Sequence, residues 1–153
     1  MGMYTKINII LPIKNDTPND IKEILQSMFE GDDIEDMKRK QLKLPSHKFF
    51  EGNRRIWFPA SGGSCYFTGT VNSNIKYTSD AGDSQMVLHI DTDFKNYDDE
   101  IELFLDWIQP YVDAEQNEFL GYSRYEEIFN PTLYFFKDKK IVSFINNNVE
   151  ENW

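Results

Sequence analysis

The residues of this chain with types and spacing suited to chemistry lie two apart along one predicted strand. His89, Asp91 and Asp93 alternate with apolar residues, so their side chains point to the same face of that strand. Neighbours on one face are about 7 Å apart, close enough for an acid–base pair or for a hard cation such as Mg²⁺. The pattern is equally typical of a strand face exposed to water. We prefer that interpretation, with no metal and no cofactor, and keep the three residues as candidate ligands.

Two other reactive side chains stand alone in the sequence. His47 lies in a basic segment without an acidic neighbour, which indicates a surface histidine. Cys65 begins an alternating strand on its apolar face, which predicts a buried thiol rather than a nucleophile. Because Cys65 is the only cysteine, an internal disulfide and a cysteine-based zinc site are excluded. No apolar run approaches the roughly 20 residues of a membrane span. We therefore expect a cytoplasmic protein that has no membrane contact.

Acidic and basic residues are separated along the chain, which has a formal net charge of −10. Residues 80–118 contain twelve acidic residues and one basic residue, Lys95, whereas residues 36–55 contain seven basic and two acidic residues. A large acidic surface disfavours binding to a nucleic-acid backbone. It favours steering toward a protein partner with a basic surface. The alternative is that the charge serves solubility alone.

The predicted partner-binding residues are of two kinds. One kind comprises Tyr122 and Arg124, which share a strand face, and Trp57, which follows two arginines; these residue types dominate the energetic centres of protein interfaces. The other kind is acidic and comes from the strand and helix of the acidic stretch. These acidic residues are Asp91, Asp93, Asp98, Asp99, Glu102 and Asp106.

Hydrophobic periodicity predicts the elements that position these residues. Continuous apolar residues predict a central strand at Tyr4–Ile13, covered on both faces or nearly so. A helical stripe follows, with Thr17 as N-cap and Gly31 as C-cap. Residues 32–64 show weak periodicity and form a long loop. Period-two alternation then predicts a hairpin, and a second helical stripe starts near Asn96 and reaches Val112. The later strands are predicted at Cys65–Tyr77, 85–94, 118–126, 132–136 and 141–145.

This order predicts one α+β domain over residues 1–145 and a frayed polar tail over 146–153. The expected architecture is a two-layer sandwich with a ferredoxin-like split βαβ core, in which two helices cover one face of a mainly antiparallel sheet. The final two strands add a C-terminal hairpin. The alternative is a more irregular α+β sheet of six or seven strands.

No catalytic motif is recognisable, and three hypotheses about function follow. The first is a small, acidic, non-enzymatic binding protein that inhibits a protein partner by covering its surface, in the manner of an immunity-type or anti-defence-type protein. The second is a small metal- or ligand-dependent enzyme with a pocket between loop 32–64 and the sheet, using His89, Asp91 and His47. The third is a homo-oligomer formed through edge strands.

Overall fold

The computed structural model describes residues 4–51, 64–67 and 86–146. Several predicted features lie outside these residues and are not described. They are Trp57, the strand from Cys65 to Tyr77 beyond Phe67, the turn that follows it, and the tail after Asn146.

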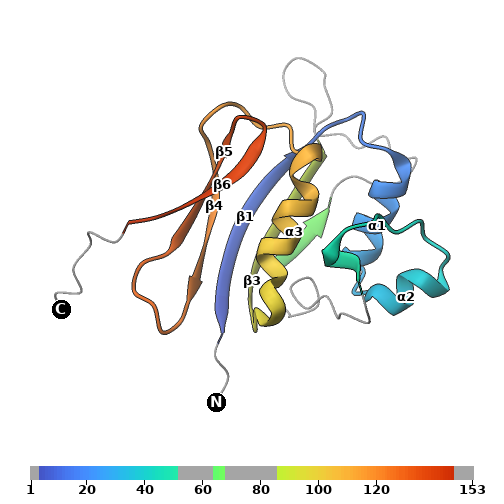
Figure 1. Cartoon of the computed structure of the whole chain (residues 1–153), viewed down its shortest axis with the longest axis horizontal. Helices are drawn as coiled ribbons and strands as arrows, with labels where there is room; N and C mark the ends of the chain where they lie inside the picture. Colours follow the sequence, from blue (N-terminus) through green and yellow to red (C-terminus); the bar gives the residue numbers. More distant parts are fainter. Residues whose placement is uncertain (1–3, 52–63, 68–85, 147–153) are drawn as a thin grey trace.

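The described residues form an α+β fold with one open antiparallel sheet of six strands, in the order β2-β3-β1-β4-β5-β6 (Figure 1). Three α-helices, α1, α2 and α3, accompany this sheet. The strands are β1 (Thr5–Ile13), β2 (Ser64–Phe67), β3 (Met86–Phe94), β4 (Glu118–Tyr125), β5 (Thr132–Lys137) and β6 (Lys140–Ile145). The helices are α1 (Asn19–Phe29), α2 (Ile34–Arg39) and α3 (Glu100–Ile108), with short 3-10 turns at Lys48–Phe50, Tyr97–Asp99 and Gln109–Tyr111.

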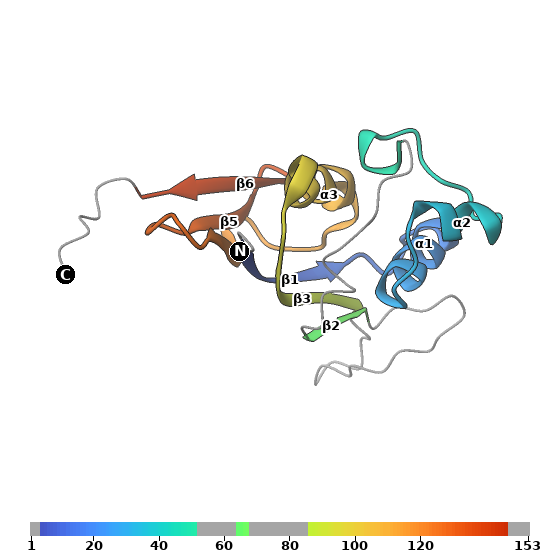
Figure 2. The same ribbon diagram turned by 90° about the horizontal axis from the view of Figure 1, so that it is seen from below.

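The predicted helical stripes of α1 and α3 are confirmed, and both face one side of the sheet. From α1, Ile24, Leu25 and Met28 are fully buried, and from α3, Phe104 and Ile108 are buried with them in a single core. The sheet contributes alternate residues of β1 and β3 to the same core. Figure 2 shows the helices on one side of β1 and β3, which is the arrangement of a two-layer α+β sandwich.

The prediction that both faces of the first strand are covered, or nearly so, is wrong, because the described residues bury only one face. β1 is central in the sheet, between β3 and β4, but only its odd-numbered residues are buried. Ile10, on the opposite face, is 49% exposed. The apolar run in the sequence therefore arises because the buried residues of β1 are apolar and Ile10, on the opposite face, is apolar as well.

The ends of α1 follow the sequence signals in part. Gly31 has the predicted C-cap role, with a φ of 96° that suits glycine. The N–H of Asp32 donates to the carbonyl of Ser27, as in a Schellman turn. The predicted N-cap is wrong, because Pro18 precedes the first helical residue and the hydroxyl of Thr17 donates to the carbonyl of Lys14 instead.

Candidate functional site

The face of the sheet opposite the helices is the candidate site, and we call it the open face. Its side chains are those that alternate with the core residues along each strand. On two neighbouring strands they are Lys6, Asn8, Ile10 and Pro12 of β1, and Val87, His89, Asp91 and Asp93 of β3. The open face also receives side chains from the other strands, and it divides into a charged part and an apolar part.

The charged part lies where β1 begins and β3 ends. Lys6 Nζ forms an ion pair with Asp91 Oδ1 at 2.8 Å. The hydrogen bond to the Asp91 carboxylate raises the pKa of Lys6, so the lysine is firmly cationic. Lys6 also lies opposite Asp93 on one side and Arg124 on the other in the strand register. The acidic residues on β3 thus lie beside basic residues on β1 and β4.

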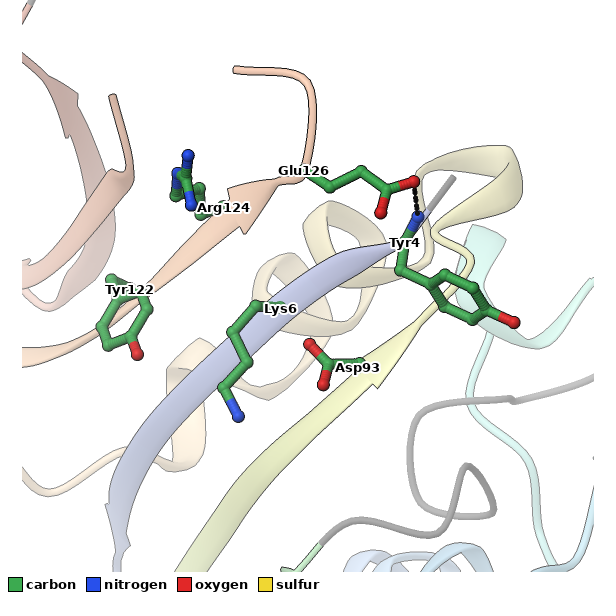
Figure 3. Close-up of a pocket in the computed structure, with 6 residues that line it drawn as sticks. All are labelled: Tyr4, Lys6, Asp93, Tyr122, Arg124 and Glu126. Atoms are coloured by element: carbon green, nitrogen blue, oxygen red, sulfur yellow. Dashed lines mark hydrogen bonds between the residues drawn. The ribbon is translucent and has the colours of Figure 1, made fainter. Parts of the chain in front are cut away.

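A depression of about 610 Å³ occupies this charged part (Figure 3). Glu126 at its rim accepts a hydrogen bond from the backbone N–H of Tyr4 at 3.0 Å. Arg124 Nε donates to the carbonyls of Ile128 and Phe129, which holds the turn after β4. The lining residues are Tyr4, Lys6, Asp93, Tyr122, Arg124 and Glu126. Mixed charge and two tyrosines make this depression suited to polar protein contacts rather than to a dry ligand cavity.

The apolar part spans β4, β5 and β6 and reaches Ile10 of β1. Phe119 is 54% exposed and Phe144 is 55% exposed. The ring of Phe119 packs against that of Phe135, its cross-strand neighbour, with centroids 5.4 Å apart. A second depression of about 350 Å³ lies between Ile10, Phe119 and Tyr122. Contiguous exposed apolar side chains with a polar border are typical of interaction surfaces.

Gly121 allows β4 to approach β1 beneath this surface. Its φ is +149°, and a Cβ built there would lie 2.1 Å from the carbonyl oxygen of Asn8. The register between β4 and β5 shifts between Phe119 and Gly121. The bulge and the glycine together position Phe119 and Tyr122 on the open face.

His89, Asp91 and Asp93 do share the open face, but they do not converge on one point. Asp91 is engaged by Lys6. His89 Nε2 lies 3.4 Å from Asn8 Oδ1, and its ring packs edge-on against Tyr66. Among the described residues, no group of three His, Cys, Asp or Glu side chains is placed to hold a metal ion.

Two of the other predicted acidic residues lie on the helix side, so the acidic stretch does not form one continuous surface. Glu102 and Asp106 are exposed on α3, which covers the face opposite Asp91 and Asp93. Asp98 and Asp99 precede α3 in left-handed backbone conformations, with φ of 58° and 56°. Alternation in the strand and the helical stripe send these carboxylates to opposite sides of the molecule, although they are close in sequence.

His47 has a partner that the sequence did not reveal. Its Nε2 lies 2.7 Å from Asp106 Oδ2, and its Nδ1 accepts the N–H of Phe49 at 3.0 Å. Phe49 in turn stacks on Trp107 with ring centroids 6.0 Å apart. The contact of Nε2 with Asp106 therefore attaches residues 47–50 to α3, whereas the hydrogen bond at Nδ1 stays within this segment and caps its 3-10 turn. Both ring nitrogens of His47 are engaged in these structural contacts.

The pocket between loop 32–64 and the sheet stays a prediction, because residues 52–63 of that loop lie outside the described residues. Residues 47–50 pack on α3, so His47 and His89 lie on opposite sides of the sheet. Asp33 and Asp36 form a reciprocal capping box at α2, a short helix within the segment that was predicted to be a long loop. Cys65 faces the core side, as predicted, and burial raises the pKa of its thiol. A raised pKa lowers the share of the thiolate, which is the nucleophilic form of cysteine.

No protein-family model, curated protein or solved structure matches this chain. In the described parts of the chain, no helix combines the length and apolar character needed to cross a membrane.

Proposed function

We propose that this protein is a non-enzymatic binding protein that covers the surface of a protein partner with its open face. The observation that carries the proposal is the set of exposed apolar side chains on a sheet face that the helices leave uncovered. Ile10, Phe119 and Phe144 are each about half exposed there. Tyr122 and Arg124 border them, and these are residue types enriched at binding hot spots.

The charge of the molecule favours a basic partner. The formal net charge of −10 attracts cationic proteins over distances comparable to the Debye length, about 10 Å at moderate salt. The open face itself carries both signs, through Lys6, Arg124, Asp91 and Asp93, so it supplies register and specificity rather than bulk attraction. Occlusion of a basic active site is the activity we infer, as in inhibitors of the immunity or anti-defence type. We infer a cytoplasmic location for it.

The arrangement of strands supports a related inference about the fold. The order β2-β3-β1-β4, with every neighbouring pair antiparallel and helices after β1 and β3, agrees with a ferredoxin-like split βαβ core. β5 and β6 would then be the added C-terminal hairpin. In this interpretation the extra hairpin widens the open face on the side of Phe119 and Phe144.

Affinity capture with matched variants tests the proposal. In the bait protein, Ile10→Lys or Phe119→Lys should weaken the affinity for a captured basic partner by about tenfold or more. Loss of a hot-spot side chain costs over about 1 kcal/mol of binding free energy. Glu23→Lys adds positive charge on the exposed side of α1 and should have little effect at moderate salt. Asp93→Lys should weaken binding, whereas Glu102→Lys on α3 should not.

Two outcomes contradict the proposal. One is the failure of any basic protein to bind at low and moderate salt. The other is a partner released by Glu102→Lys and retained by Phe119→Lys, since the helix side would then be the interface. Capture should be repeated at two salt concentrations, because the long-range charge contribution falls with salt while the apolar contact does not.

A further inference from the structure

β6 is the last strand of the described sheet, and its outer edge pairs with no other described strand. β5 pairs with it on one side, from Lys137↔Lys140 to Thr132↔Ile145. In Figure 2 its C-terminal end points away from the helices. An uncovered edge presents a row of backbone N–H and C=O groups to another strand.

The turn that joins β5 to β6 determines which backbone groups face outward. Asp138 and Lys139 form a two-residue turn in which both φ angles are positive, 52° and 63°. Such a turn makes Lys137 and Lys140 a hydrogen-bonded pair, and bonded and non-bonded pairs then alternate along the hairpin. Ile141, Ser143 and Ile145 consequently direct their N–H and C=O groups away from β5.

One hydrogen bond supports this assignment. The N–H of Ile141 donates to the side-chain oxygen of Gln109 at 3.0 Å, which a group engaged by β5 could not do. Gln109 therefore occupies the first outward donor of the edge. The groups of Ser143 and Ile145 remain directed outward beyond it.

The far half of β6 lacks the features that protect natural sheet edges. Proteins block edge strands with charged side chains, proline or bulges. Residues 141–145 are Ile, Val, Ser, Phe and Ile, without charge or proline. Phe144 is 55% exposed on the open face, and Ile145 is 48% exposed on the other face. An edge of this kind is suited to strand pairing with a partner chain.

We propose that β6 pairs antiparallel with β6 of a second copy of this chain, with Phe144 opposite Phe144 of the second copy. In this register Ser143 exchanges both backbone hydrogen bonds with Ile145 of the second copy, and Ile145 does the same with Ser143. Every outward group of these two residues is then satisfied. The Gln109–Ile141 bond is left intact.

The intact bond and the two-fold symmetry of a homodimer argue against a register centred nearer the turn. A pair centred on Ser143 would place Ile145 of the second copy opposite Ile141, whose N–H is already used by Gln109. A pair centred on Phe144 pairs only Ser143 and Ile145 of the two strands, and it leaves the N–H of Ile141 bonded to Gln109. It also forms a non-hydrogen-bonded pair, in which opposite Cα atoms are only about 4.5 Å apart and aromatic side chains meet.

Sedimentation velocity over a wide range of concentrations tests the proposal. The unmodified chain should form dimers. Ser143→Pro removes one outward N–H without breaking a bond to β5, and should raise the dimer dissociation constant by about tenfold or more. Ser143→Ala keeps the N–H and should remain dimeric, and circular dichroism should show that both variants fold. A chain that stays monomeric at all concentrations, or a dimer unaffected by Ser143→Pro, overturns the proposal.

Disulfide cross-linking tests the register separately. In a Cys65→Ser background, Phe144→Cys should cross-link rapidly to itself under mild oxidation, because opposing residues of a non-bonded pair satisfy disulfide geometry. Val142→Cys lies on the same face, two residues away, and should cross-link far more slowly. Faster cross-linking through position 142 than through 144 would overturn the proposed pairing. The dimer and its tests do not depend on the proposed binding function.

Discussion

At Gly121 the close approach of β4 to β1 leaves no space for a side chain. A Cβ there would lie 2.1 Å from the Asn8 carbonyl oxygen and 2.6 Å from the Ile9 Cα. Both atoms belong to backbone, so a flexible side chain cannot relieve the contact. We predict that Gly121→Ala lowers the free energy of unfolding by about 3 kcal/mol, the upper end for overpacking, as measured by urea denaturation.

Gly31 provides the matched control for this prediction. Its φ of +96° also favours glycine, but no atom lies within 4 Å of the position of a Cβ. Gly31→Ala should therefore cost only the backbone conformation, about 1 kcal/mol. Equal losses of stability in the two variants would show that backbone conformation, rather than the contact with Asn8, determines the requirement at Gly121.

Single residues were predictable where their role is local and hidden where it is not. The C-cap at Gly31 and the core-facing side of Cys65 follow from neighbours in sequence. The pairing of His47 with Asp106 joins residues that are 59 positions apart, and no local pattern signals it. Ile10 was missed for a different reason. An apolar residue in an apolar run gives no sign that its face of the strand is uncovered.

At the scale of elements, Asp32 connects the end of α1 to the end of α2. Its carboxylate accepts hydrogen bonds from Ser27 Oγ and Lys40 Nζ. Burial opposes the ionised form, but the hydrogen bonds from Lys40 and Ser27 outweigh it, so the pKa of Asp32 is lowered from its ordinary 3.8. A lowered pKa means that the folded state prefers the carboxylate more strongly than the unfolded chain does.

The pH dependence of this connection has a definite sign. Its contribution to stability is fully present above the unfolded pKa of about 3.8 and is lost as the pH falls through the lower folded value. We predict that Asp32→Asn is less stable than the unmodified chain at neutral pH, and that the difference shrinks as the pH approaches the folded pKa. Urea denaturation at a series of pH values measures it. Glu115→Gln, at an exposed side chain, is the control substitution and should change stability little.

The elements themselves were largely predictable, because hydrophobic periodicity depends on burial of one face. The stripes of α1 and α3 and the alternation of β3 each have a single buried side. The start of α3 was harder to predict from the sequence. α3 begins at Glu100 after two left-handed residues, and Asn96 accepts the N–H of Ile101 at 3.0 Å from five residues earlier. No simple capping pattern has that spacing.

At the scale of the whole molecule, the division of the acidic residues was not predictable from their sequence. A run of acids in residues 80–118 suggested one surface, yet β3 directs Asp93 to the open face while α3 exposes Glu102 on the other layer. Which side an acid faces depends on how each element packs on its neighbours. The apolar part of the open face depends in the same way on the alignment of β4, β5 and β6.

Pairing through β6 would place the open faces of two copies side by side. Its two-fold axis would run perpendicular to the sheet, so the open faces of both copies would point in the same direction. Such a dimer can hold two partner molecules on one surface, and linked sites gain affinity by factors of about 10²–10⁴. We predict that Ser143→Pro weakens binding to a densely immobilised partner by about tenfold or more, as measured by surface plasmon resonance.

The same variant should bind the partner in solution with unchanged affinity, because Ser143 directs its backbone toward the second copy and not toward the open face. Lowering the density of the immobilised partner should remove the difference between the variant and the unmodified chain, since one dimer could then no longer reach two partners. An equal loss of affinity in solution would place the edge of β6 within the partner contact itself. β6 would then be part of the surface that binds the partner, rather than the strand through which two copies of this chain pair.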